Sequence, residues 1–143
     1  MTHPRPVLIA GAGIGGLALG VALRRAGVPV AIYEKAAQLK PIGWGLQLAP
    51  NGMRALRDLG LYDAALAAGQ RIHSGRMLTP QGRVLKAMTF DTLDARVGVP
   101  TVAINRGRLH QLLLETFGTE PVHVGAAAVG FEDRGDHVAL RLA

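Results

Sequence analysis

The chain has 143 residues, of which 49% are hydrophobic, 18% charged and only 4% aromatic, and its net charge is +6. This balance excludes a disordered chain and indicates one globular domain whose core is built from Ala, Leu, Val and Gly. There is no cysteine, which excludes disulfides, thiolate nucleophiles and cysteine-based zinc sites and favours a reducing cytoplasm as the location.

The distribution of charged and apolar residues bears on the partners of the chain. Its basic residues are scattered, without a continuous basic run or interleaved aromatic side chains, so we expect an anionic cofactor or a solvated surface and no nucleic acid. The long apolar stretches are interrupted by Gly, Arg and Pro, so we expect no membrane span. The start of the chain, Met1–Pro6, is short and polar and does not resemble a signal peptide.

The first elements in chain order form a strand–helix–strand unit. An unbroken apolar run over Val7–Ala10 predicts a buried parallel strand. Apolar residues at helical spacing predict a helix over Ile14–Ala26, with Gly27 as its C-terminal cap. A second buried strand is predicted over Val28–Tyr33, so the connection should be a right-handed βαβ unit.

A Gly/Pro-rich loop is predicted next, over Lys40–Gly52. Asn51 is predicted to cap a helix that ends at Gly60, and a second short helix should cover Leu61–Ala68. The remaining predictions are strands over Arg71–Leu78, Arg83–Thr89, Val102–Asn105 and Val122–Val124, a helix over Arg108–Phe117, and a hairpin formed by Ala126–Glu132 and His137–Leu142. Asp91 and Asp94 flank a predicted loop and are interpreted as helix or turn caps.

Three glycines, Gly11, Gly13 and Gly16, follow the first predicted strand and open the first predicted helix. In this context the pattern is typical of dinucleotide binding. The first glycine permits a tight turn, the second lets the backbone approach a pyrophosphate, and the third lets the helix pack closely on the strand. The N–H groups of the first helical turn, near Ile14 and Gly15, are then expected to point at the anion.

One acid, Glu34, stands at the end of the second predicted strand, on the same edge of the sheet as the glycine turn. A carboxylate at this place can accept both hydroxyl groups of an adenosine ribose. It would repel a 2′-phosphate, so NADP is disfavoured at this particular subsite. The motif does not distinguish FAD from NAD, because both cofactors contain the adenosine group that it binds.

Three further stretches carry a resemblance: Tyr33-Glu34-Lys35, "GWGLQLAPNGMRALRDLGL" from Gly43 to Leu61, and "INRGRLHQLLLE" from Ile104 to Glu115. They resemble the FAD-dependent aromatic hydroxylases, the group A flavoprotein monooxygenases that include salicylate hydroxylase-like enzymes. The first is similar to that family's ribose-binding acid and the basic residue after it. The second is similar to its Gly-x-Gly-Ile-x-Leu-x-Pro-Asn-Ala segment beside the flavin, and the third to its Arg-x-x-Leu-x-x-x-Leu helix.

The resemblance adds residues to the expected cofactor site. It implies that Lys35 follows the ribose-binding acid, that Arg106 contacts the phosphate or ribityl part of the cofactor, and that Ala128 lies on a strand passing the adenine. Gly45 would let the backbone approach the flavin edge. Two of these residues have a plainer alternative: Gly45 as an ordinary loop glycine, and Arg106 as a surface arginine capping a helix. Trp44 either stacks near the flavin ring or packs against other side chains of the protein.

The resemblance also implies the fold. We expect an α/β chain with a Rossmann-like, FAD-binding parallel sheet and a small antiparallel β segment, with residues 71–104 contributing to a substrate domain. The family has an Asp-Gly motif after this point and a Gly-Asp motif much further on. The chain contains no Asp-Gly dipeptide, and Gly135-Asp136, which has the letters of the second motif, falls in a predicted turn. We therefore expect residues 1–143 to be the N-terminal part of a monooxygenase whose C-terminal half is absent.

The function implied by the resemblance is that of an NAD(P)H-dependent monooxygenase. NAD(P)H reduces the bound FAD, the reduced flavin forms a flavin hydroperoxide with O2, and this hydroxylates a small aromatic or related ring. No residue of the sequence stands out as an acid–base catalyst, and the histidines lack the paired spacing of a metal site. The alternatives are another NAD- or FAD-dependent oxidoreductase and an inactive dinucleotide-binding fragment that acts by association. Exposed sheet edges would favour a homodimer or a complementing C-terminal chain.

Overall fold

The structure, a computed structural model, describes residues 5–40 and 43–143, and these form two compact units. The first unit consists of the described residues up to Lys40 together with His110–Ala143, and the second consists of Gly43–Leu109. The predicted N-terminal segment Met1–Pro6 and the predicted loop Lys40–Gly52 lie partly outside the described residues. The two units are described in turn.

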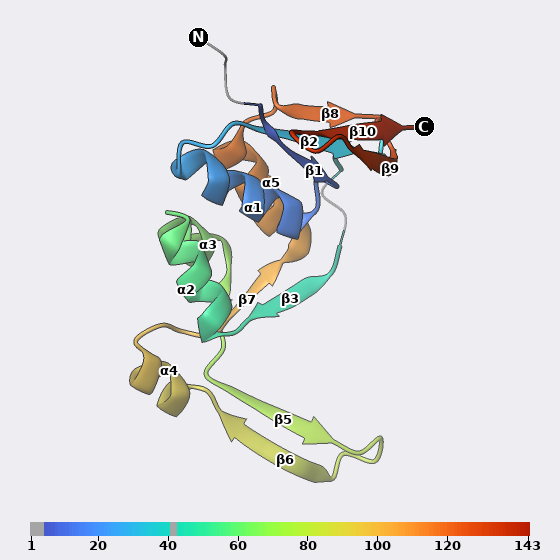
Figure 1. Cartoon of the computed structure of the whole chain (residues 1–143). Helices are drawn as coiled ribbons and strands as arrows, with labels where there is room; N and C mark the ends of the chain where they lie inside the picture. The colour runs from blue at the N-terminus through green and yellow to red at the C-terminus, as the bar shows by residue number, and fades with distance from the viewer. Residues whose placement is uncertain (1–4, 41–42) are drawn as a thin grey trace. The chain divides into compact units, whose positions relative to one another are not determined.

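A parallel three-stranded sheet forms the centre of the first unit (Figure 1). Strands β1 (Val7–Ala10), β2 (Val30–Glu34) and β8 (Val122–Val124) lie in the order β1-β2-β8. Helix α1 (Ile14–Arg25) connects the first two strands. The predicted parallel sheet and its strand–helix–strand unit are confirmed, because the apolar runs that predicted buried strands pair with one another in register.

The core of the first unit lies between this sheet, helix α1 and the part of helix α5 (Arg106–Phe117) that begins at His110. Leu17, Ile32 and Phe117 are at most 1% exposed. A Cβ added at Gly20 would lie 2.8 Å from the ring of Phe117 and 3.1 Å from Cδ1 of Ile32. The two helices and the sheet therefore approach one another this closely because position 20 carries no side chain.

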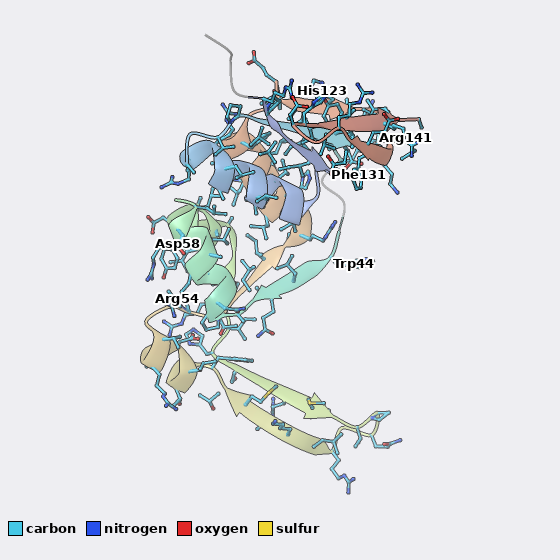
Figure 2. All side chains as sticks on the ribbon, viewed as in Figure 1. Trp44, Arg54, Asp58, His123, Phe131 and Arg141 are labelled. Carbon is cyan, nitrogen blue, oxygen red and sulfur yellow. The ribbon has the colours of Figure 1, made fainter. Side chains whose placement is uncertain are left out.

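Strands β9 (Ala128–Asp133) and β10 (Val138–Leu142) complete the first unit as an antiparallel hairpin, as predicted. The Gly135-Asp136 pair lies in its turn, where Gly135 has a φ of 83°. Several large apolar side chains of the hairpin are exposed, among them Phe131 at 66% (Figure 2). The hairpin therefore carries an apolar surface that the described residues leave open.

The second unit contains a small antiparallel sheet of β3 (Gly45–Leu48), β7 (Val102–Asn105) and β4 (Gln70–Arg71), in the order β3-β7-β4. Helices α2 (Pro50–Asp58) and α3 (Tyr62–Ala68) follow β3 in the chain. The antiparallel β segment predicted from the strands over Arg71–Leu78 and Arg83–Thr89 lies outside this sheet apart from Arg71, and it forms the separate hairpin described below.

Two predictions at the start of this unit are wrong. The loop predicted over Lys40–Gly52 contains β3, whose pairing partner β7 lies too far along the chain to be visible in a local pattern. Asn51 does not cap α2, because the helix begins one residue earlier, at Pro50, with Ala49 at the cap position. Proline suits the first position of a helix, where its missing N–H would have no intrahelical partner.

The rest of the second unit consists of a hairpin, β5 (Ser74–Leu78) and β6 (Val84–Thr89), and helix α4 (Asp91–Val97). The strand predicted over Arg71–Leu78 is divided, since its start pairs with β7 and its remainder with β6. Helix α4 was not expected, because its seven residues are too few to show a helical period.

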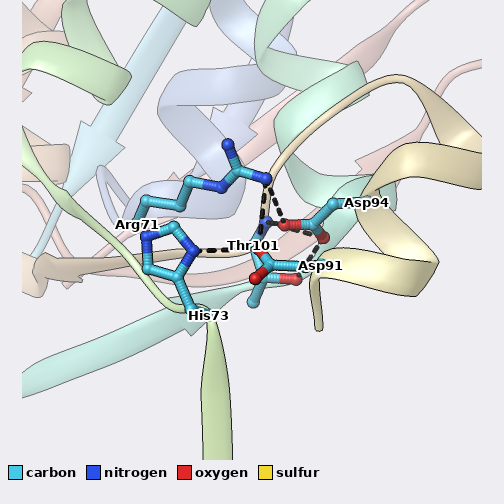
Figure 3. A network of polar contacts seen from close by, with 5 residues as sticks. All are labelled: Arg71, His73, Asp91, Asp94 and Thr101. Carbon is cyan, nitrogen blue, oxygen red and sulfur yellow. Dashed lines mark hydrogen bonds and ion pairs between the residues drawn. The ribbon is translucent and has the colours of Figure 1, made fainter. Parts of the chain in front are cut away.

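Polar contacts join α4 to Arg71 of β4, to His73 and to Thr101 (Figure 3). Asp94 is 3% exposed and accepts hydrogen bonds from the backbone N–H and the hydroxyl of Thr101, each at 3.0 Å. Arg71 lies 3.2 Å from Asp91 and 3.7 Å from Asp94, and His73 lies 2.9 Å from Asp91. The prediction of capping is wrong for both acids: no side chain caps α4, whose N-cap residue is Phe90, and Asp94 bonds to Thr101 outside the helix.

Candidate cofactor-binding site

The glycine turn between β1 and α1 has the geometry that the sequence pattern predicted. Gly11 has a φ of 101°, a conformation that side chains disfavour, and its N–H donates to the carbonyl of Tyr33 at 2.7 Å. A Cβ at Gly16 would overlap the carbonyl oxygen of Gly11. Glycine is therefore required at position 16 by the close packing of the helix on the turn.

Open space surrounds the other glycines of the turn. A Cβ added at Gly13 or Gly15 would meet no described atom within 4 Å, apart from its own chain neighbours and helix backbone. Gly13 is the N-cap residue of α1, and within the described chain no side chain caps this helix end and no acid occupies its first turn. The N–H groups at the start of α1, near Ile14, therefore face a space where an anion fits.

Glu34 ends β2 and holds the backbone on two sides of the site. Its Oε2 accepts the N–H of Ala12 at 2.8 Å, and its Oε1 accepts the N–H of Ala36 at 2.8 Å. The bond from Ala36 is the main cause that lowers the pKa of Glu34, and burial opposes it. A carboxylate has about four lone-pair positions, so two remain for the hydroxyl groups of a ribose.

His110 reaches the same loop from helix α5. Its Nε2 lies 2.7 Å from the carbonyl oxygen of Ala12. The sequence gives His110 no role beyond the absence of a metal-site spacing, and no local signal points to this contact, because the two residues are 98 positions apart.

A cavity of about 230 Å3 lies beside the glycine turn, lined by Ala10, Gly11, Tyr33, Glu34, Lys35, Ala127 and Ala128. Four residues expected at the cofactor site meet here, namely Gly11, Glu34, Lys35 and Ala128. Tyr33 stacks on His123 with a centroid distance of 4.7 Å, so the cavity has a rigid aromatic wall that the sequence did not predict. The cavity thus adjoins the glycine turn, at the place where the sequence predicts an adenosine group joined to a pyrophosphate.

The other two expected residues, Gly45 and Arg106, belong to the second unit. Gly45 is the first residue of β3 and pairs with Asn105. Arg106 is the first residue of α5, at the strand-to-helix junction that the sequence predicted. The side chain of Asn105 accepts the N–H groups of Gly107 and Arg108 at 2.9 and 3.2 Å, so Asn105 is the residue that caps this helix.

The structure singles out Gly43, which the sequence did not. Gly43 has a φ of 142°, and a Cβ at this position would lie 3.0 Å from Cβ of Arg106. Trp44 follows it, and its carbonyl accepts the N–H of Arg106 at 3.0 Å. The indole of Trp44 is 90% exposed, so it does not pack within its unit (Figure 2). Gly43 and Trp44 together hold the backbone beside Arg106.

The described residues contain no group of three or more His, Cys, Asp or Glu that could hold a metal ion. None of the described helices is long and apolar enough to cross a membrane.

Comparison with known proteins decides the family. The sequence model of the FAD binding domain matches residues 5–141. The chain belongs to this family. The resemblance to the FAD-dependent aromatic hydroxylases is thereby confirmed, and the α/β fold of this FAD-binding domain is the partial monooxygenase fold that the sequence predicted.

Two curated relatives and one solved structure illustrate the likeness. The FAD-binding domain is 45% identical over 137 residues to the aurachin C monooxygenase/isomerase of Stigmatella aurantiaca, covering 96% of this chain and 36% of the relative. It is 37% identical over 139 residues to 3-hydroxybenzoate 6-hydroxylase 1 of Aquipseudomonas alcaligenes, covering 92% and 35%. The crystal structure of Klebsiella pneumoniae HpxO complexed with FAD and uric acid matches with a TM-score of 0.84 and 25% identity, covering 94% and 34%. The chain thus spans about a third of the length of these proteins.

Proposed function

We propose that this chain holds FAD for an NAD(P)H-dependent monooxygenase that hydroxylates a small aromatic or related ring. The observation that carries the proposal is the arrangement around Ala12. Glu34 accepts the N–H of Ala12 in the glycine turn, and it also lines the cavity together with Lys35 and Ala128. The carboxylate is held ionised by backbone N–H groups, so it can accept hydroxyl groups and rejects a phosphate in their place.

The residues of this site are proposed to bind different parts of the cofactor. The start of α1, with Gly13, Ile14 and Gly15, is proposed to bind the pyrophosphate through backbone N–H groups. Glu34 binds the ribose hydroxyls, and the cavity beside Ala128 takes the adenine. When bound, FAD supplies the electron-transfer and oxygen chemistry, while the protein binds, orients and shields it.

The second unit is proposed to contribute Arg106 and Gly45 to the same cofactor, as the resemblance implies. A guanidinium is a bidentate donor suited to a phosphate or ribityl oxygen. Gly43 supports this role, since a side chain there would displace that of Arg106. Residues 71–104 are proposed to contribute to the substrate side of the complete enzyme.

Two relatives support the proposed class of substrate. The name of one specifies 3-hydroxybenzoate, and the crystal structure of another contains uric acid. Both compounds are small and cyclic, and on this ground we propose a small aromatic or related ring as the substrate here. NAD(P)H is proposed as the electron donor.

The visible absorption spectrum of the purified chain, recorded before and after addition of FAD and desalting, tests cofactor binding. We expect flavin bands that survive desalting, and we expect Glu34→Ala to abolish them, because the ribose loses its acceptor. A protein that takes up NAD in calorimetry and no FAD would contradict the proposal and favour another oxidoreductase. Binding of FAD without oxidation of NAD(P)H would favour the inactive dinucleotide-binding alternative for this chain.

A further inference from the structure

Ala12 lies at the centre of the glycine turn, and both of its peptide groups are held by side chains from distant parts of the first unit. Its N–H donates to Oε2 of Glu34 at 2.8 Å, and its carbonyl oxygen lies 2.7 Å from Nε2 of His110. Ala12 is 1% exposed, so with these two side chains in place its N–H and carbonyl are shielded from water and depend on them as partners.

The contact with His110 has a fixed direction. A carbonyl oxygen only accepts, so Nε2 of His110 must carry the proton and donate it. The bond fixes the imidazole in the form with a proton on Nε2. It also fixes the plane of the peptide between Ala12 and Gly13.

The plane of that peptide decides which group the turn presents. The described chain contains no cis peptide, so the carbonyl of Ala12 and the N–H of Gly13 point in opposite directions. With the carbonyl directed at His110, the N–H of Gly13 points away from it. Rotation of this peptide would exchange the two, and it meets little steric resistance beside Gly13, which has no side chain.

The exchange would matter for an anion. An N–H group attracts a phosphate oxygen, and a carbonyl oxygen repels it. We propose that His110 is a positioning residue, which holds the peptide between Ala12 and Gly13 so that the turn offers an N–H and not a carbonyl to the pyrophosphate of the cofactor. This inference rests on the proposed function for the identity of the anion.

The role of His110 is distinct from that of Glu34. Glu34 fixes the preceding peptide, through the N–H of Ala12, and also offers acceptor positions to the ribose. His110 directs its only N–H, on Nε2, at the carbonyl of Ala12, so this group is not available to a ribose. Loss of His110 should therefore weaken binding of the pyrophosphate part and leave the ribose contact intact.

Nuclear magnetic resonance of the chain without any flavin tests the contact itself. We expect the imidazole of wild-type His110 to carry its proton on Nε2. We expect the carbonyl carbon of Ala12 to shift in His110→Phe, which fills the space without a donor, and to return toward the wild-type value in His110→Gln, whose amide N–H can take the place of Nε2. Gln111→Leu, on the exposed side of the same helix, is the matched control and should leave Ala12 unchanged.

Titration with FAD, and separately with adenosine, tests the consequence. We expect His110→Phe to weaken FAD binding about 10-fold, the effect of one lost hydrogen bond to a buried group, and His110→Gln to restore most of it. Adenosine, which has no phosphate, should bind equally to all variants. A loss of adenosine binding equal to that of FAD would overturn the assignment to the pyrophosphate.

Two other results would overturn the inference. A wild-type His110 whose only proton is on Nδ1, or an Ala12 carbonyl that is the same in His110→Phe and in the wild type, means that the contact does not exist. A chain that binds no FAD at all contradicts the proposed function, and the Ala12 shift alone then supports or overturns the role of His110 in holding the turn.

Discussion

Asp94 and Thr101 form a buried pair in the second unit. A single oxygen, Oδ1 of Asp94, accepts both the N–H and the hydroxyl of Thr101, each at 3.0 Å, and the second oxygen lies 3.1 Å from the same N–H. Asp94 is 3% exposed and Thr101 is fully buried. The pair ties helix α4 to the residue directly before β7, the central strand of its sheet.

Removal of this carboxylate should destabilise the second unit. In Asp94→Ala the N–H and the hydroxyl of Thr101 remain buried without their acceptor, which costs about 2–3 kcal/mol of the free energy of unfolding. Urea denaturation followed by circular dichroism measures the loss. Asp91→Ala is the control, since the side chain of Asp91 is 47% exposed and its ion pair with Arg71 is worth less than about 1 kcal/mol. Equal losses of stability in the two variants would mean that the buried hydrogen bonds of Asp94 contribute no more than the exposed ion pair of Asp91.

The glycines of the cofactor turn should separate into two classes. Gly16→Ala should lower the free energy of unfolding by about 2–3 kcal/mol, because its Cβ overlaps the carbonyl oxygen of Gly11. Gly13→Ala adds a Cβ in open space and should change it by less than about 1 kcal/mol. The substitution Gly13→Ala should instead lower the affinity for the cofactor, with FAD binding weakened about 10-fold. If Gly13→Ala binds FAD as well as the wild type, the pyrophosphate does not approach this position.

The lowered pKa of Glu34 predicts an acid-sensitive contribution to stability. Backbone N–H groups, that of Ala36 first, favour the charged form in the folded state, so the pKa lies below its ordinary value of 4.5. The unfolded chain then binds the proton more tightly. The contribution is complete above pH 4.5 and is lost as the pH falls through the lower pKa of the folded state.

Comparison with Glu34→Gln isolates this contribution. Thermal denaturation of both proteins between about pH 6 and pH 3 should show a difference in stability that shrinks as the pH falls. A difference that stays constant over this interval would mean that Glu34 keeps its ordinary pKa in the folded chain.

Trp44 should report on the cofactor without any substitution. It is the one tryptophan of the sequence and is 90% exposed, so its fluorescence should resemble that of free tryptophan and be quenched readily by iodide. If the indole stacks near the flavin, added FAD should protect it from iodide. Tryptophan that remains fully accessible in a protein saturated with FAD would exclude stacking.

The exposed apolar side chains of the β9–β10 hairpin should favour self-association. Phe131 is 66% exposed, Val129 61% and Val138 49%. Burial of such a surface stabilises a complex by about 25 cal/mol per Å2 of apolar area. We expect sedimentation to show association that weakens in Phe131→Ser. Arg141→Ser, on the same hairpin, is the control for a change without loss of apolar surface.

Much of the first unit was predictable because its signals are local. Val7–Ala10 is an unbroken apolar run, and the glycines after it carry their own conformational demands, so strand, turn and helix all follow from neighbouring residues. Glu34 was predictable for the same reason, since its place at the end of β2 follows from the length of the helix and strand before it.

The remainder depends on contacts between distant positions. Strand β3 lies in a segment rich in glycine and proline and forms by pairing with β7, and His110 shows no local sign of its contact with Ala12. Gly43 was overlooked because its constraint comes from the side chain of Arg106. In each case the sequence contains the residues, while the reason for them lies in a partner more than fifty positions away.

The first unit is discontinuous in the chain, and this has a consequence for biosynthesis. His110 follows Ala12 by 98 positions, and β8 follows β2 at a similar interval. At a translation rate of about 5–20 residues per second, about 5–20 s pass between the synthesis of the glycine turn and that of His110, its contact from α5. The second unit is continuous and emerges whole in that interval. The nascent protein should therefore acquire its antiparallel sheet first and become competent for a nucleotide last.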